Sequence, residues 1–239
     1  MSQTALVLAA AAFVAGIIKG FTGFGGSLVM APLFIVVLSP AQTLGTVVAV
    51  NVATAWQLLR QSWGCMQPQV VLPMAAACAL ATPAGIALVL LVDPATGRRI
   101  IGVAVLASGI ALLSGWRRLR PPRMTNTLLV GALSGIMNGL AGVGGPPAAL
   151  WLLAGRDGAA RDRAGLIVYV ALTQAAVAAM IIVAGVLDGP ALLRALLLAP
   201  LHVAGTLAGA RLFHTVPDTT VRITAIVIIV VLGAYTMAR

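Results

Sequence analysis

The sequence predicts an all-α polytopic membrane protein made of two inverted repeats, each a glycine-broken helical hairpin followed by three transmembrane helices. Of its 239 residues, 61% are hydrophobic and 8% are charged, whereas soluble domains carry about 25% charged residues. So few charges cannot coat a water-facing surface, which excludes a soluble globular protein, a disordered chain and a nucleic-acid-binding protein. The net charge of +10 comes from arginines between long apolar runs, a placement typical of anchoring to anionic lipid headgroups.

Six apolar runs have a length that suits single helical crossings, which need about 20 residues. Turn signals such as Asp93-Pro94 separate them. Two further regions are too long for one helix and are interrupted by glycine clusters, so each is either a hairpin or one long broken crossing. With hairpins, the repeats are residues 1–122 (hairpin 5–38; helices 42–60, 70–92 and 100–116) and residues 123–239 (hairpin 127–154; helices 163–187, 190–210 and 221–238).

The arginines favour the hairpins. Hairpins place ten arginines on one side of the membrane and four on the other, whereas single broken crossings divide them seven and seven. The positive-inside rule therefore puts both termini in the periplasm of a bacterial inner membrane and turns the second half upside down relative to the first. The cytoplasmic set is Arg60, Arg117, Arg118, Arg120, Arg123, Arg156, Arg161, Arg163, Arg211 and Arg222, and the opposite set is Arg98, Arg99, Arg194 and Arg239.

A glycine pattern supports the two repeats. It occurs in the first hairpin and recurs 119 positions later, and a second pattern, Gly85, Arg98 and Gly109, recurs with an offset of 124. Inverted repeats with interrupted helices are a plan of secondary transporters, whose sites lie at the repeat interface near the membrane midplane. The first pattern is Gly16, Gly20, Gly23, Gly25 and Gly26, and its recurrence is Gly135, Gly139, Gly142, Gly144 and Gly145.

The two glycine breaks are the predicted substrate site. Glycine-rich backbone at membrane depth survives only where it is buried in protein or lines a watery cavity. A helix that restarts there presents unpaired N–H groups and a partial positive charge, which suit an anion. We expect Ser27 to cap the first restart and Pro146 or Pro147 to occupy the first turn of the second. The predicted ligands from the breaks are Thr22, Gly23, Gly25, Gly26 and Ser27, with Gly142, Gly144 and Gly145 opposite.

Close helix packing is the competing explanation for these glycines. It is the better one for Gly16 and Gly20 and for Gly135 and Gly139, which are spaced by four. The denser clusters that follow exceed what packing needs, and we interpret them as unwound segments.

Lys19 is the one basic residue placed well inside an apolar segment. A charge there costs about 2.5–3.5 kcal/mol on insertion scales and marks a functional candidate. Its side chain could bind the anion, reach the membrane surface, or cap the carbonyl groups that end the first half-helix. Its counterpart at the 119 offset is Asn138, so the two sides of the site should differ.

Other polar residues in the spans complete the candidate site. Thr54 and Thr173 share the 119 offset, and Asn51 lies on the same helix face as Thr54. Such side chains either contribute to the site or join helices to one another. His202 is either a titrating group or a buried core histidine.

The residues indicate no enzyme, cofactor or metal site. The spans contain no acidic residue, no paired carboxylates and no histidine cluster with metal spacing. Cys65 and Cys78 fit no metal or redox signature. If transport is coupled to protons, Lys19 or His202 must carry them or the substrate must enter protonated; transport driven by the anion gradient is equally open.

The duplicated Gly-x-x-Gly-x-Gly-Gly, at Gly20–Gly26 and Gly139–Gly145, resembles the TauE/SafE sulfite exporter family, also called toluene-sulfonate uptake permeases. The similarity extends through both halves, including Gly205–Arg211 and the Pro-Asp turn that follows. It implies transport of sulfite, sulfonates or sulfoacetate across a bacterial inner membrane, with the glycine-rich hairpins at Gly20–Ser27 and Gly139–Pro147. The chain departs from the pattern in the prolines of its second half and in Asn138 opposite Lys19.

We therefore expect a secondary transporter for small anions, most simply sulfite or organosulfonates, working by alternating access around the broken helices. Its partners would be the anion and membrane lipid, with a homodimer as an open arrangement. The alternatives are an accessory membrane subunit that transports nothing, a permease for carboxylates, and a permease for metal cations.

Overall fold

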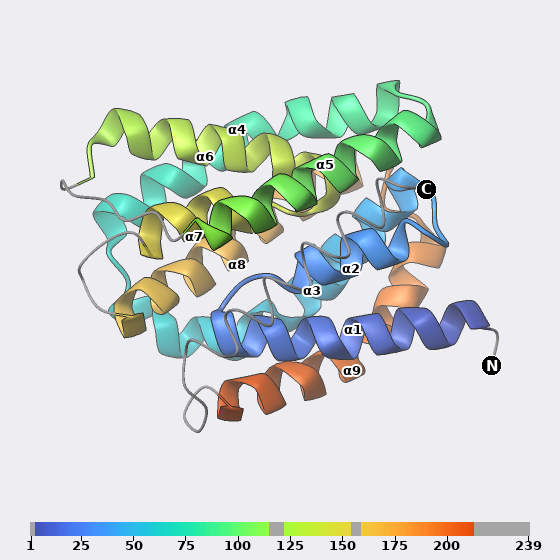
Figure 1. The fold of residues 1–239 in the computed structure, drawn as a ribbon, viewed down its shortest axis with the longest axis horizontal. Coiled ribbons are helices and arrows are strands. Elements are labelled where there is room, and N and C mark those ends of the chain that lie inside the picture. Colours follow the sequence, from blue (N-terminus) through green and yellow to red (C-terminus); the bar gives the residue numbers. More distant parts are fainter. Residues whose placement is uncertain (1–2, 115–121, 154–158, 213–239) are drawn as a thin grey trace.

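The protein is described by a computed structural model that covers residues 3–114, 122–153 and 159–212 (Figure 1). These residues form helices joined by short turns, with no strand among them. The fold is therefore all-α, as predicted. The elements are α1 (Gln3–Thr22), α2 (Gly26–Phe34), α3 (Pro40–Ser62), a 3₁₀ turn (Trp63–Cys65), α4 (Pro68–Leu91), α5 (Pro94–Leu113), α6 (Met124–Ala141), α7 (Gly145–Leu153), α8 (Ala159–Val183) and α9 (Gly189–Leu212).

Two helical hairpins occupy the places of the glycine clusters. In Figure 1, α1 runs from the N-terminus across the molecule and α2 returns beside it, and α6 and α7 do the same in the other half. The second helix of each hairpin has 9 residues, against 20 in α1 and 18 in α6. Figure 1 also shows α1 and α6 running in opposite directions. This is the arrangement that an inverted pair of hairpins needs, although the division into repeats at residue 122 stays a prediction.

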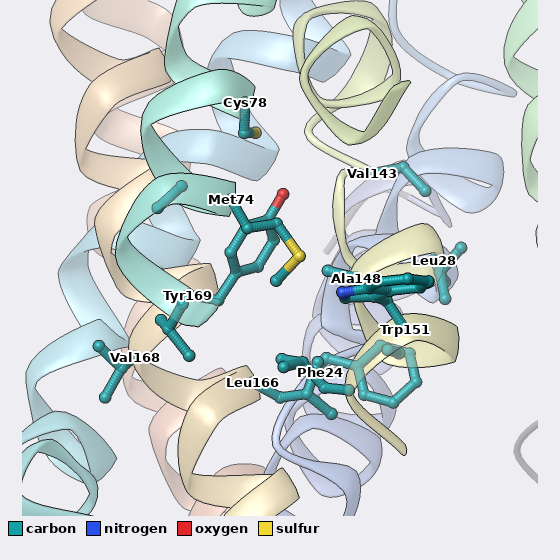
Figure 2. Packing of buried hydrophobic residues seen from close by; sticks show 14 of the residues in the cluster. Phe24, Leu28, Met74, Cys78, Val143, Ala148, Trp151, Leu166, Val168 and Tyr169 are labelled. Atoms are coloured by element: carbon teal, nitrogen blue, oxygen red, sulfur yellow. The ribbon is translucent and has the colours of Figure 1, made fainter. Parts of the chain in front are cut away.

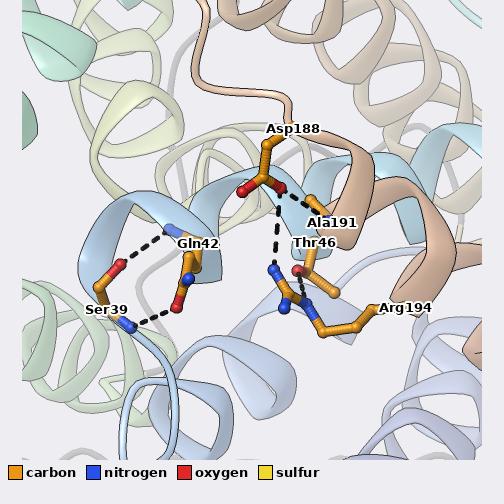
Figure 3. Close-up of polar contacts among 6 residues, drawn as sticks. All are labelled: Ser39, Gln42, Thr46, Asp188, Ala191 and Arg194. Atoms are coloured by element: carbon orange, nitrogen blue, oxygen red, sulfur yellow. Dashed lines mark hydrogen bonds and ion pairs between the residues drawn. The ribbon is translucent and has the colours of Figure 1, made fainter.

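Local sequence signals explain where α3, α5 and α9 begin. Ser39 and Gln42 form a capping box, in which the Ser39 hydroxyl accepts from the Gln42 N–H (3.3 Å) and the Gln42 side chain accepts from the Ser39 N–H (3.2 Å) (Figure 3). Asp93 caps α5 by accepting from two backbone N–H groups. Asp188 accepts from the Ala191 N–H at 2.7 Å and so caps α9.

The start of α9 is also tied to α3. Arg194 donates from Nε to the hydroxyl of Thr46 at 3.1 Å and lies 3.9 Å from the Asp188 carboxylate (Figure 3). This contact holds the start of α9 against the start of α3. The two bonded residues are 148 positions apart in the chain.

The observed helices differ from the expected spans most at α5 and α8. The expected span 100–116 starts six residues late, since α5 is Pro94–Leu113. The expected span 163–187 starts four residues late and ends four residues late, since α8 is Ala159–Val183. Its C-terminal limit follows from Gly185, whose φ of +66° is left-handed and terminates the helix. The expected span 221–238 lies outside the described residues.

Glycines let four of the helices approach closely, in two matching pairs. A Cβ atom on Gly16 or Gly20 of α1 would overlap the backbone carbonyl of His202 or Thr206 on α9. A Cβ atom on Gly135 or Gly139 of α6 would likewise overlap a carbonyl of α4, that of Cys78 or of Thr82. The packing explanation thus holds for these four glycines. His202 and Thr206 lie 124 positions after Cys78 and Thr82, the offset of the second sequence pattern.

The main apolar core lies where the tips of both hairpins meet α4 and α8. Phe24, Leu28, Val143 and Ala148 from the hairpins pack here with buried residues of α4 and α8 (Figure 2). Trp151 is buried in the same core and donates from its indole nitrogen to the Thr127 hydroxyl at 3.2 Å. The core therefore holds the two hairpins together.

The outer surface suits a lipid environment. Large apolar side chains such as Leu80, Leu91 and Val183 are more than four-fifths exposed, which would be costly in water. Four of the described helices, α1, α4, α8 and α9, are long and apolar enough to span a membrane. The protein is an all-α, multi-pass membrane protein.

Candidate functional site

The first break follows Thr22 and depends on two left-handed glycines. Gly23 has a φ of +83° and Gly25 a φ of +89°, a conformation that glycine adopts at little cost. The Gly23 N–H donates to the Lys19 carbonyl at 2.8 Å and closes α1. The Thr22 hydroxyl lies 2.8 Å from the Ile18 carbonyl oxygen and 2.5 Å from that of Phe24, so it bridges the break.

The second break has the same closing turn and a different restart. The Gly142 N–H donates to the Asn138 carbonyl at 2.7 Å, and Gly142 has a φ of +69°. The Ser134 hydroxyl donates to the Gly144 carbonyl. Pro146 and Pro147 are the second and third residues of α7 and supply no N–H, so this restart offers fewer donors than that of α2, as expected.

The restart of α2 points free backbone donors at the site. Gly25 is the N-cap of this helix, and among the described residues no acceptor contacts the N–H groups of Gly26 or Ser27. The expectation that Ser27 is the N-cap was wrong, because the left-handed turn at Gly25 starts the helix two residues earlier. Ser27 instead presents its hydroxyl oxygen to Asn51.

Lys19 is a buried cation held by neutral groups. Its side chain is 5% exposed, and Nζ donates to the Asn51 carbonyl oxygen Oδ1 (3.2 Å) and to the Thr54 hydroxyl oxygen (3.0 Å). The Asn51 amide nitrogen donates to the Ser27 hydroxyl (3.0 Å), so Asn51 connects Lys19 to the start of α2. Within residues 3–114, 122–153 and 159–212, no carboxylate forms an ion pair with Lys19.

The opposite side of the site is neutral. Asn138, 1% exposed, donates to the Thr173 carbonyl at 3.4 Å and accepts from the Gln174 amide at 3.4 Å. Gln174 also donates to the Gly142 carbonyl at 3.0 Å and so holds the second break against α8. The asymmetry expected from Lys19 and Asn138 is thus present in the charge of the two sides.

A central cavity of about 20 Å³ lies between the two hairpin tips. This space accommodates about one water molecule, so the hairpins are closed together here. The predicted site residues that line it come from both hairpins and from α3 and α8: Lys19, Gly25, Gly26, Ser27, Asn51, Asn138, Gly142, Gly145 and Thr173. Whether they bind a substrate stays a prediction.

The remaining predicted residues lie apart from this cavity. Gly23 and Thr54 line a second, smaller cavity of about 10 Å³ that shares Lys19 with the central one. Thr22 and Gly144 line neither cavity: the Thr22 hydroxyl is engaged within the first break, and Gly144 packs against Asn138 and Ser134. His202 is fully buried and bonds from Nδ1 to the Ala12 carbonyl at 2.9 Å, outside both linings.

Sequence reasoning missed some residues at the site. Phe24 and Val143 form apolar walls of the central cavity and are related by the 119 offset, a signal that was present in the sequence. Arg163 was expected as the first residue of the span 163–187 but lies in the second turn of α8, where it contacts the end of α1. No local pattern indicates that contact, which joins residues 143 positions apart.

The described residues contain no group of three or more His, Cys, Asp or Glu side chains that could hold a metal ion. The groups that converge on the central cavity are instead one ammonium, backbone N–H groups, amides and hydroxyls. Such donors suit an anion that carries several oxygen atoms.

The family described as "Sulfite exporter TauE/SafE" matches residues 8–236, nearly the whole chain. The chain belongs to the TauE/SafE sulfite exporter family. The resemblance seen in the glycine motifs is thereby confirmed, and membership implies a membrane exporter or permease for sulfite or related sulfur anions. TauE/SafE proteins are transporters rather than enzymes. No curated protein and no solved structure matched the chain.

Proposed function

We propose that this TauE/SafE protein is a secondary transporter that binds sulfite or an organosulfonate between its two hairpin tips. One observation carries the proposal: the buried ammonium of Lys19 has neutral partners and no carboxylate partner among the described residues. A buried cation without a counter-ion is unfavourable. An anion in the adjoining cavity would supply the missing charge.

The broken helices add donors to that charge. The Gly26 and Ser27 N–H groups begin α2 at the cavity, where the helix dipole favours a negative ligand. Asn138, Gly142 and Gly145 would close the opposite side with neutral groups. Asn51 and Thr54 orient Lys19 through their hydrogen bonds. Three sulfonate or sulfite oxygens would then meet donors from both halves.

Alternating access is the mechanism that this arrangement supports. The matched helix pairs, α1 with α9 and α6 with α4, each join a helix of residues 1–122 to one of residues 123–239, so the units that move around the site would be built from both inverted repeats. We place the protein in a bacterial inner membrane with both termini in the periplasm, on the strength of its arginine distribution.

A carboxylate permease is the second candidate, because a carboxylate would use the same ammonium and N–H donors. A metal-cation permease is disfavoured, since Lys19 would repel the ion and none of the described residues that line the central cavity is acidic. An accessory subunit without transport would leave the buried charge of Lys19 unexplained.

The test is flux into proteoliposomes that contain the purified protein. Radiolabelled sulfite, methanesulfonate, acetate and a divalent cation are compared in the wild type, in Lys19→Met and in Arg99→Gln. Arg99 is exposed near the start of α5, so the control removes one positive charge away from the site. We expect sulfur anions to be transported by the wild type and by Arg99→Gln, and by Lys19→Met at no more than about a hundredth of that rate.

Two results would overturn the proposal. One is unchanged sulfite flux in Lys19→Met, which would remove Lys19 from the mechanism. The other is an absence of sulfite and methanesulfonate flux in a correctly folded wild-type protein, which would favour the carboxylate permease if acetate moves and the accessory subunit if nothing moves.

A further inference from the structure

A third, much larger pocket opens where α3 ends and α8 begins. Its volume is about 610 Å³, and we call it the vestibule. Its polar wall consists of Gln61, Gln67, Gln69, Arg161 and Arg163, and Cys65 also lines it. Two arginines and three amides can all donate hydrogen bonds, and none of the described residues that line the pocket is acidic. The vestibule therefore has the chemistry of an anion-binding surface.

Arg163 connects the vestibule to the end of α1. Its guanidinium donates from Nη2 to the Gly20 carbonyl (2.6 Å) and from Nε to the Phe21 carbonyl (3.2 Å). These are carbonyl groups of the last turn of α1, where a cation is favoured by the helix dipole. The guanidinium thus lies between the vestibule and the helix that carries Lys19.

Gly23 and the smaller cavity lie between Arg163 and the central cavity. Gly23 packs against the Arg163 side chain and Ile167, one turn further along α8. Gly23 and Ile167 also line the smaller cavity, together with Lys19. That cavity shares Lys19 with the central one. The interface between α3 and α8 therefore extends from the vestibule to the site.

On the far side of the site, the interface between α3 and α8 is closed by apolar side chains. There, Leu44 and Val48 of α3 pack with Val177 and Ile181 of α8 in a buried apolar cluster. An ion cannot pass through such a cluster without losing its hydration. Among the described residues, apolar side chains therefore close the far side of this interface, whereas the vestibule lies on the near side.

We propose that the vestibule is a second anion-binding site on the route to the central cavity, and that Arg161 and Arg163 bind small oxyanions such as sulfonates there. Arg161 is exposed and attracts the anion. Arg163 then exchanges the Gly20 and Phe21 carbonyls for the anion, which frees the end of α1 to move. The inference rests on the proposed function for the direction of travel, but the binding site itself does not depend on transport.

Cys65 provides a built-in reporter of this site. It is exposed in the vestibule, whereas Cys78, the second cysteine, is buried. Purified protein in detergent is treated with an anionic (sulfonatoethyl) or a cationic (trimethylammonioethyl) methanethiosulfonate, and modification is followed by mass spectrometry. We expect Cys65 to react faster with the anionic reagent than with the cationic one. Arg161→Gln should reduce the ratio of these two rates about threefold. Arg99→Gln should leave it unchanged, and Cys65→Ser should abolish labelling.

Protection by methanesulfonate separates this inference from the proposed function. At constant ionic strength against chloride, methanesulfonate should slow the labelling of Cys65 in the wild type and in Lys19→Met, whose central site is disabled. It should not slow labelling in Arg163→Gln, and Arg163→Lys, which keeps the charge without the paired donors, should show partial protection. Should Arg163→Gln fail to fold, Arg161→Gln and Arg163→Lys give the same comparison.

Equal rates for the two reagents and no protection in the wild type would overturn the vestibule site, even if sulfite flux were normal. Protection of Cys65 by methanesulfonate in a wild-type protein that transports no sulfur anion would support the vestibule and overturn the proposed function.

Discussion

Asn51 accepts a hydrogen bond from the Lys19 ammonium over 3.2 Å, and this contact joins the last turn of α1 to the middle of α3. The same amide donates to Ser27 at the start of α2. One side chain therefore sets the position of the buried charge relative to the free N–H groups of the broken helix.

Replacing Asn51 with leucine should weaken substrate binding more than it destabilises the fold. The change keeps the side-chain size but removes the acceptor for Lys19, and a hydrogen bond to a charged group contributes about 1.5–3 kcal/mol. We expect the apparent KM for sulfite uptake to rise at least tenfold. Thr82→Val is the matched control, because Thr82 is equally buried but bonds to the Cys78 carbonyl away from the cavities. An unchanged KM in Asn51→Leu would contradict the role given to Asn51.

Alanine at Gly16 or Gly135 should destabilise the protein to a similar extent. In both substitutions the new Cβ atom would overlap a carbonyl oxygen of the partner helix, that of His202 or of Cys78. Such overpacking costs roughly 1–3 kcal/mol. The measurement is the thermal unfolding midpoint in detergent, with Gly64→Ala as the control, since a Cβ atom there meets nothing within 4 Å. A large loss for one substitution and none for the other would contradict the equivalence of the two helix pairs.

Gly142→Ala should impair transport beyond its effect on stability. Gly142 and Gly185 have similar left-handed φ angles, +69° and +66°, so alanine should cost each about 1–2 kcal/mol of backbone strain. Only at Gly142 would the Cβ atom also crowd Val47, at 3.2 Å, beside the central cavity. Uptake per folded molecule should fall in Gly142→Ala and stay at the wild-type level in Gly185→Ala. Equal uptake in the two variants would argue against a role for the second break.

Asp93 should make α5 sensitive to acid. Hydrogen bonds from Thr96 and Ala95 to its carboxylate lower the pKa of Asp93 below its ordinary value. Because the folded pKa is below the unfolded one, the stabilisation is fully present above the unfolded pKa of about 3.9 and is lost as the pH falls through the folded pKa. The unfolding midpoint of the wild type should therefore decrease more steeply below pH 4 than that of Asp93→Asn. Parallel curves would contradict this.

The repeated glycines made the breaks predictable, because their φ angles and spacing depend on local sequence. The 119 offset also placed Lys19 and Asn138 at equivalent points. Asn51 and Thr54 were predicted to share a helix face, but nothing in the sequence indicated that both would bond to Lys19. The N-cap of α2 was misplaced, because one left-handed glycine shifts the start of a helix and the choice between Gly25 and Ser27 depends on the turn. The contact of Arg163 with α1 could not be predicted, since it arises from the packing of distant helices.

The glycine backbone in the walls of the central cavity has a consequence for how the protein opens. Several of its walls are glycine backbone, which has no rotamer to swing aside, and the space is too small for an anion with three oxygens around a sulfur atom. Loading must therefore displace whole backbone segments, on the microsecond-to-millisecond timescale of collective motions. A bulky compound bound between the hairpin tips would accordingly slow the transport cycle by preventing this backbone movement, rather than only compete with the substrate for binding.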